Sequence, residues 1–194
     1  MITNQEYIEN FITSDNGEKL PFLWTHGATK QHLGDGIIVY SLIQHMRYKS
    51  CVCIGTGGGY IPRIMTQARI DLHKQGIFSG DPTYSWGDIG TTYVVDPCNG
   101  VGGDSNISDM EGFYQKTFFP RFIKETSEKA YYDFFVREDI MIDLLFIDGD
   151  HSYEGVKKDF DLYSKRLNPN GLIMVHDTDS SYSETLITSE DAKK

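Results

Sequence analysis

Four short apolar runs, each followed at once by glycine, aspartate or histidine, constrain the fold of this chain more than any other feature. The runs span residues 51–54, 91–95, 142–147 and 172–175. They are rich in β-branched and aromatic residues, as buried strands are, and stretches with helical periodicity lie between them. Strands that alternate with helices predict a parallel sheet. We therefore expect an α/β fold with a doubly wound, mostly parallel sheet.

The remaining stretches predict helices, loops and one weaker strand. Helices are expected over about 3–11, 35–47, 60–74, 110–129 and 153–167, with loops over 76–90, 99–109 and 168–171. A further short strand is expected at 134–136. The whole chain, 1–194, is expected to form one domain, with an N-terminal helical segment (1–48) and a Rossmann-like core (50–178).

Apolar spacing predicts which helix faces are buried. In the helix over 35–47, Ile38, Leu42 and Met46 recur every four residues, which places them on one face. The last helix carries an apolar stripe of Tyr153, Val156, Phe160, Tyr163 and Leu167. Its spacing predicts that this stripe packs into the core. Cys51 and Cys53 share one face of the first strand and are expected in the core as well.

The charge balance limits the kinds of partner. The chain has 194 residues with 28 acidic and 18 basic side chains, a formal net charge of −10. Such a surface repels phosphate backbones and anionic lipids, so we expect no nucleic-acid and no membrane partner. The N-terminus has no secretory pattern, no apolar run is long enough to span a membrane, and 3 cysteines are too few for a disulfide framework. These features predict a cytoplasmic protein.

The glycine cluster after the first run predicts a ligand-binding turn. Gly55, Gly57 and Gly59 alternate with other residues, and glycines let a strand turn directly into a helix while a ligand approaches the backbone. The G-x-G-x-x-G spacing of dinucleotide sites is absent, which argues against nicotinamide and flavin cofactors. The observed spacing suits S-adenosylmethionine. A glycine turn without a ligand is the alternative.

Asp96 directly follows the second run. An acid at this position can accept hydrogen bonds from both ribose hydroxyls of a nucleoside. The alternative is a turn or helix-capping aspartate before Pro97. Because the glycine cluster precedes it, we favour the ribose role.

The densest polar cluster is Asp148-Gly149-Asp150-His151, at the end of the third run. Two carboxylates one residue apart, with Asp177 at the end of the neighbouring strand, can hold a hard cation. Such a cation would bind an acceptor hydroxyl and lower its pKa. The alternative is that the acids cap the following helix. His151 and His176 are candidates for a base, a cofactor contact or metal ligands, or are ordinary hydrogen-bonding residues.

Three blocks of the sequence resemble one family. CVCIGTGGGY, TTYVVDP and the segment 142–177 are similar to class I S-adenosylmethionine-dependent methyltransferases of the macrocin and sugar O-methyltransferase type, to which the cephalosporin-hydroxylase-like proteins are related. The resemblance implies a Rossmann-like methyltransferase fold. It also implies cofactor-binding, metal-binding and catalytic residues. The cofactor-binding residues would be Gly55, Thr56, Gly57, Gly59, Tyr60, Asp96 and Asp148. The magnesium ligands would be Asp148, Asp177 and His176. The catalytic residues would be Asp150, as a base, and His151.

The chain departs from the family pattern at three places. Cys53 stands where the family usually has an acid, two residues before the first glycine. His176 precedes Asp177 where the metal-binding members usually have two acids. Too few residues follow Asp177 for the antiparallel strand pair that usually completes the sheet, so we expect that pair to be missing.

The residues and the resemblance together predict an S-adenosylmethionine-dependent methyltransferase. The expected reaction is a metal-assisted O-methylation of a small hydroxylated molecule, with Mg²⁺ as the expected ion. One alternative is a metal-dependent glycosyltransferase that uses Asp148-Gly149-Asp150 to bind a nucleotide sugar. Another is a truncated module that binds the cofactor without turnover. Neither the acceptor nor the oligomeric state follows from the sequence.

Overall fold

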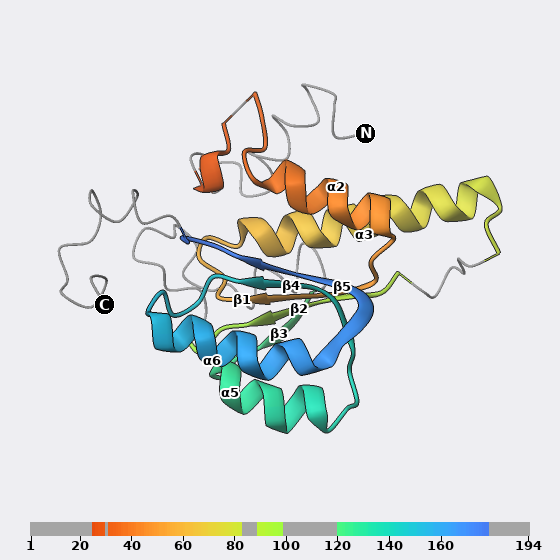
Figure 1. Cartoon of the computed structure of the whole chain (residues 1–194). Coiled ribbons are helices and arrows are strands. Elements are labelled where there is room, and N and C mark those ends of the chain that lie inside the picture. Colours follow the sequence, from red (N-terminus) through yellow and green to blue (C-terminus); the bar gives the residue numbers. More distant parts are fainter. Residues whose placement is uncertain (1–24, 30, 83–88, 99–119, 179–194) are drawn as a thin grey trace.

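The chain folds around a five-stranded parallel sheet with helices on both faces (Figure 1). The computed structural model describes residues 25–29, 31–82, 89–98 and 120–178. The strand order is β3-β2-β1-β4-β5, and every neighbouring pair is parallel. The strands are β1 (Ser50–Ile54), β2 (Thr91–Val95), β3 (Arg121–Ile123), β4 (Ile142–Ile147) and β5 (Leu167–Val175). The expected doubly wound α/β fold is confirmed.

The helices form one layer on each face of the sheet (Figure 1). On one face lie α2 (Gly36–Met46) and α3 (Tyr60–Ser79), and the short 3-10 turn η1 (Thr25–Gly27) precedes α2. On the other face lie α5 (Ser127–Ala130), the π-helical turn η2 (Tyr131–Val136), α6 (Tyr153–Tyr163) and the 3-10 turn η3 (Ser164–Arg166). None of the helices in the described part of the chain is both long and apolar enough to span a membrane.

Each face of the sheet buries its own apolar layer. Cys51 and Cys53 point toward α2 and α3, where they are buried as expected. The alternate residues Val52 and Ile54 point toward α5, η2 and α6. Because both faces are covered, the central strands β1 and β4 are buried almost throughout, as parallel strands in α/β proteins are.

The expected strand at 134–136 is wrong. These residues end the helical segment of α5 and η2, which forms the crossover between β3 and β4. The helical conformation buries Phe135 completely, with its ring centroid 5.2 Å from that of Tyr163 on α6. Tyr132 on the same turn is 55% exposed. A run of aromatic residues suits a strand or a buried helix, and here packing against α6 decides for the helix.

The expected helix over 110–129 is also wrong in part. Residues 121–123 form β3, which pairs with β2 at the edge of the sheet, and the helix begins only at Ser127. Thr126 caps this helix, because its side chain accepts a hydrogen bond from the backbone N–H of Lys129. Residues 110–119, like the expected helix over 3–11 and the expected loop over 99–109, lie outside the described residues.

The face of α2 that carries Ile38, Leu42 and Met46 is not the face that is buried. In α2, Ile38 is 51% and Met46 39% exposed. The buried residues are instead Gly36, Val39, Tyr40 and Ile43. They follow the i, i+3, i+4, i+7 spacing of one helix face, whereas a strict four-residue spacing drifts around the helix.

The expected stripe of α6 is only partly in the core: Val156, Tyr163 and Leu167 pack there as expected, whereas its other two residues do not. Tyr153 is 71% and Phe160 46% exposed, while Tyr163 is fully buried. The buried residues of α6 are Gly155, Asp159, Leu162 and Tyr163.

Two other elements have different bounds. The helix expected to end near residue 74 continues to Ser79, where Gly80 ends it in a left-handed conformation. The expected turn at 168–171 lies inside β5 as an irregularity between its pairings with Ile142 and Leu144. The strand expected to be buried at 172–175 lies at the edge of the described sheet, and Leu172 is 39% exposed.

The helical placement of η2 gives a stability prediction. Phe135→Ala is expected to lower the free energy of unfolding by about 3–5 kcal/mol, because it empties a fully buried site. Tyr132→Ala, in the same turn, is the control and is expected to cost less than about 1 kcal/mol. Urea unfolding followed by circular dichroism measures both values. Equal losses for the two variants would contradict the helical assignment.

Candidate functional site

The polar clusters that follow the strands meet at one edge of the sheet. The hydrogen-bond pattern of the sheet continues for one residue beyond the central strands. The backbone N–H of Gly55 donates to the carbonyl of Val95 (2.9 Å), and that of Asp148 donates to the carbonyl of Ile54 (2.9 Å). The backbone N–H of His176 likewise donates to the carbonyl of Ile147 (3.0 Å). This register holds the residues after β1, β2, β4 and β5 next to one another, as the sequence predicted.

A cavity of about 530 Å³ opens at this edge. The loops after β1, β2 and β4 line one part of it, and the start of α5 and the first two turns of α6 line another part. Its polar lining residues include Thr56, Asp96, Ser127, Asp148, Asp150, His151, Lys158 and Asp159. Both its volume and its place at the carboxyl ends of parallel strands are typical of ligand sites in α/β folds.

Asp96 fastens the glycine loop to the end of β2. Its carboxylate accepts hydrogen bonds from the backbone N–H of Thr56 (3.0 Å), the Thr56 hydroxyl (2.8 Å) and the backbone N–H of Cys98 (2.7 Å). Asp96 is only 8% exposed. These bonds give Asp96 a turn-stabilising role and hold Thr56 at the wall of the cavity.

Gly55 allows the glycine loop to lie directly against the end of β4. Its φ is +83°, a value that favours glycine, and a Cβ at this position would collide with the backbone carbonyl of Asp148. Gly57 also has a positive φ, +46°, but a Cβ there would meet no atom within 4 Å. The two glycines thus have different roles: Gly55 permits a close backbone contact, while Gly57 only permits the turn.

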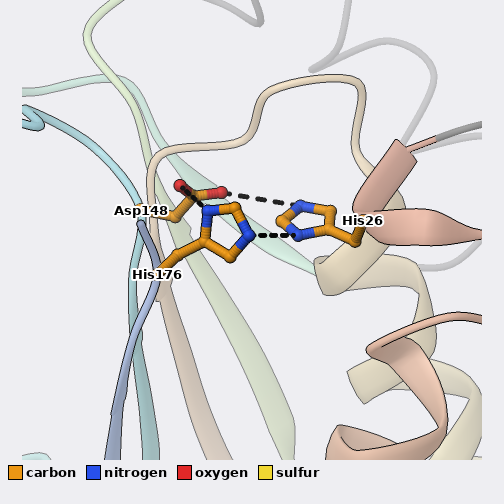
Figure 2. Close-up of side chains that lie close together, drawn as sticks. All are labelled: His26, Asp148 and His176. Carbon is orange, nitrogen blue, oxygen red and sulfur yellow. Dashed lines mark hydrogen bonds and ion pairs between the residues drawn. The ribbon is translucent and has the colours of Figure 1, made fainter. Parts of the chain in front are cut away.

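Five side chains form a histidine–aspartate cluster from η1 and from the segments that follow β4 and β5. The cluster consists of His26, Asp148, His151, His176 and Asp177. Figure 2 shows its inner part, in which the Asp148 carboxylate faces His26 and His176. Asp148 Oδ2 lies 3.5 Å from His26 Nε2, and Asp148 Oδ1 lies 3.2 Å from His176 Nδ1. The two imidazoles also contact each other, with 3.1 Å between His26 Nδ1 and His176 Nε2.

His151 and Asp177 form the outer part of the cluster. His151 Nε2 lies 3.2 Å from Asp148 Oδ1, and His151 Nδ1 lies 3.4 Å from Asp177 Oδ2. The His151 side chain is 56% exposed, against 11% for His26. The cluster therefore has a half-buried side formed by Asp148 and two imidazoles, and an open side at His151 and Asp177.

Asp148 controls the protonation of this cluster. Burial opposes its ionisation, but hydrogen bonds from His151 and His176 and the positive charge of the imidazoles lower the pKa of Asp148 to about 2. In turn, the hydrogen bond to Asp148 raises the pKa of His151 and of His176. Burial lowers the pKa of His26. At neutral pH Asp148 is thus a carboxylate surrounded by three imidazoles.

The sequence analysis missed His26. It reaches the cluster because the segment before α2 packs on α3. The Tyr60 hydroxyl donates a hydrogen bond to the carbonyl of Leu33 (2.6 Å), and the Tyr60 ring stacks on His26 at 6.1 Å. The residue lies more than 100 positions from Asp148 in the sequence, and no motif surrounds it. Only the tertiary packing of the segment could identify it.

Comparison with known proteins decides the family. A family model described as "Methyltransferase domain" matches residues 52–178, which is more than half of the chain. The chain belongs to this methyltransferase domain family. The matched segment begins in β1 and ends just after Asp177, so it includes the glycine loop, Asp96 and the ends of β4 and β5.

Other relatives cover smaller stretches of sequence. "Uncharacterized protein y4gI" of Sinorhizobium fredii is 38% identical over 61 residues, which are 31% of this chain and 6% of that protein. "Uncharacterized protein R132" of Acanthamoeba polyphaga mimivirus is 56% identical over 36 residues, which are 19% of this chain and 16% of that protein. The matches thus span only a small part of each of these proteins.

A solved structure shares the fold of the methyltransferase domain. The crystal structure of CalS11, calicheamicin methyltransferase, superposes with a TM-score of 0.51 and 14% identity. The match covers 90% of this chain and 77% of that one. At this identity the likeness concerns the Rossmann-like fold of the sheet and its helices.

The structure places the sequence-predicted residues of the methyltransferase domain in three groups. Gly55, Thr56, Gly57, Asp96 and Asp148 line the cavity together with Asp150 and His151. The predicted metal ligands Asp148, His176 and Asp177 lie together in the histidine–aspartate cluster. Gly59 and Tyr60 are not among the residues that line the cavity. Gly59 precedes the first turn of α3, and Tyr60 is buried beneath His26.

The close approach of Gly55 to Asp148 gives a second stability prediction. Gly57→Ala is expected to cost about 1–2 kcal/mol, because only the left-handed backbone conformation opposes it. Gly55→Ala is expected to cost about 1–3 kcal/mol more, because its Cβ also collides with the β4 backbone. Urea unfolding of the two variants measures the difference. Indistinguishable values would show that the two loops do not touch.

Proposed function

We propose that this methyltransferase domain transfers the methyl group of S-adenosylmethionine to a hydroxyl oxygen of a small molecule, with the help of a divalent cation. One observation carries the proposal. Asp148 lines the cavity next to the glycine loop and is also the centre of the histidine–aspartate cluster. A cofactor in the cavity and an acceptor hydroxyl at the cluster would therefore meet at one residue, as a displacement at the methyl carbon requires.

The cofactor would lie along the glycine loop. We propose contacts from Gly55, Thr56, Gly57 and Gly59, with Tyr60 supporting the loop from below. A carboxylate has about four acceptor positions, and Thr56 and Cys98 occupy three positions of Asp96. Asp96 is therefore proposed to accept one ribose hydroxyl, rather than the two expected from the sequence.

His151 is the better candidate for the base. The Asp150 carboxylate accepts a hydrogen bond from the backbone N–H of Ser152 (2.9 Å), and this bond lowers the pKa of Asp150. His151 lines the cavity, is exposed, and has a pKa raised by Asp148. A base with a pKa near the working pH is the most effective. Asp150 would then stabilise the turn before α6 through Ser152, whose own side chain caps the helix.

The proposed step conserves atoms and charge. The acceptor oxygen forms a bond to the methyl carbon while the carbon–sulfur bond of S-adenosylmethionine breaks, which leaves S-adenosylhomocysteine. The hydroxyl proton passes to His151, whose imidazolium is stabilised by the Asp148 carboxylate. The family match is to a methyltransferase domain, which argues against the glycosyltransferase alternative.

Calorimetry tests the cofactor assignment. We expect S-adenosylmethionine and S-adenosylhomocysteine each to bind at one site per chain, and a uridine diphosphate sugar with Mn²⁺ not to bind. Asp96→Ala is expected to weaken binding of both cofactor forms at least about tenfold, because it releases the glycine loop. Asp161→Ala, on the exposed side of α6, is the matched control and should bind as the wild type does. Absence of binding by the wild type would refute the proposal.

A pH profile tests the base. Methyl transfer from labelled S-adenosylmethionine to a panel of catechols, sugars and polyols is expected to rise as pH rises through the pKa of His151, which the hydrogen bond to Asp148 raises when no cation is bound. Only the neutral imidazole can accept the proton. His151→Gln should lose this rising limb, and its rate should fall about 10²–10⁴-fold.

Asp150→Asn separates the two candidates for the base. It keeps an oxygen that can accept the Ser152 hydrogen bond, and it should retain most of the rate. A large loss in Asp150→Asn with little loss in His151→Gln would assign the base to Asp150 instead. Cofactor binding without transfer to any acceptor would favour the non-catalytic module.

A further inference from the structure

We infer that His26, Asp148 and His176 bind a divalent transition-metal ion, such as Mn²⁺, Fe²⁺, Co²⁺ or Zn²⁺, in preference to Mg²⁺. The inference gives a chemical identity to the cation of the proposed function and rests on that part of it. It also assigns a metal ligand, His26, that lies outside the segment matched by the family.

The three side chains are close enough to share one ion. Each offers a donor atom, and these atoms all lie within 4.8 Å of one another. Ligands bound at ~2.1 Å lie about 3–3.4 Å apart in octahedral or tetrahedral shells. The shortest contacts of the group, 3.1 Å, 3.2 Å and 3.5 Å, engage both ring nitrogens of each imidazole, so an ion that takes one nitrogen from each ring would replace these contacts. Ring rotations that turn one nitrogen of each imidazole toward the ion beside Asp148 would complete the site.

The donor types argue against the magnesium ion that the family resemblance implies. Mg²⁺ takes oxygen ligands in a strict octahedron and keeps several of its waters. Two of the three inner donors here are imidazole nitrogens, which suit Zn²⁺, Fe²⁺ and neighbouring ions. Two histidines and one carboxylate also leave coordination positions open, as in sites that bind a substrate at the metal. His176 thus replaces an acid and changes the kind of ion that fits.

The protein holds this group in place before any ion binds. His26 is packed between the rings of Tyr60, 6.1 Å away, and Phe146, 6.0 Å away. Its backbone has a left-handed conformation, with φ 48°, and its carbonyl accepts a hydrogen bond from the backbone N–H of Asp35 (2.9 Å). His176 and Asp148 follow adjacent strands, β5 and β4. Ligands fixed in this way lose little freedom when the ion binds.

The open side of the cluster adjoins the cavity in which the methyl transfer is proposed to occur. Asp148 is the one inner ligand that also lines the cavity, and His151 and Asp177 lie next to it on the exposed side. An acceptor hydroxyl that approaches the cavity past His151 would reach the ion beside Asp148. There the ion would lower the pKa of the hydroxyl, while His151 remains available to take the proton.

Metal titrations of the full chain test the inference without cofactor or acceptor. After treatment with a chelator and its removal, Co²⁺, Mn²⁺, Zn²⁺ and Mg²⁺ are each added in a calorimeter, and the visible spectrum of the Co²⁺ form is recorded. We expect one transition-metal ion per chain, a Co²⁺ spectrum with mixed nitrogen and oxygen ligands, and Mg²⁺ affinity at least about 100-fold weaker.

Ligand variants identify the site. His26→Gln and His176→Gln are each expected to weaken Co²⁺ binding at least about tenfold and to change its spectrum. His45→Gln, an exposed histidine in the last turn of α2, is the matched control and should bind as the wild type does. Circular dichroism in chelator shows whether each variant is folded; if His26→Gln is not, His176→Gln decides.

Three results would overturn the inference: no bound ion, Mg²⁺ affinity equal to that of Co²⁺, or unchanged Co²⁺ binding in folded His26→Gln and His176→Gln. S-Adenosylmethionine binding to the same samples is measured in chelator. Metal binding without cofactor binding would sustain this inference and refute the proposed methyl transfer. Cofactor binding without metal binding would refute this inference and the help of the cation, while the methyl transfer itself would stand.

Discussion

The site depends on one contact, between the turn after β1 and the first residue after β4. The sheet reverses its direction of growth between these two strands, so their connecting loops diverge to opposite faces and leave room for a ligand. Gly55 lets the two backbones touch, and the N–H of Asp148 bonds to the end of β1 (2.9 Å). The same register places the Asp148 side chain between the cavity and the imidazoles.

The segment before α2 completes the arrangement from outside the sheet. Tyr60, at the start of α3, holds Leu33 by a hydrogen bond and supports His26 with its ring. The glycine loop and the His26 segment are therefore joined through one helix turn. A conformational change in the loop after β1 would shift His26 as well as the lining of the cavity. The proposed cofactor site and the proposed metal site are therefore coupled.

The sequence predicted the sheet because its strands are short, apolar and bounded by glycine and aspartate, and it predicted that their polar ends would converge. It did not predict η2, because an aromatic run such as 131–136 fits either a strand or a helix until its tertiary partners are known. It also missed His26, since a histidine without a surrounding motif gains a role only through packing. The sequence could not show which of Asp150 and His151 is the base. An aspartate that stabilises a turn and an aspartate that acts as a base look the same in the sequence.

The most direct test of the account is the distance between the metal and the cofactor. Mn²⁺ bound to the wild-type protein should strongly broaden the NMR signals of bound S-adenosylhomocysteine, most of all those of the protons beside its sulfur, because Asp148 adjoins both sites. The diamagnetic Zn²⁺ form provides the reference. If Mn²⁺ and S-adenosylhomocysteine bind together and the cofactor signals keep their Zn²⁺ widths, the two sites do not share Asp148 and the account is wrong.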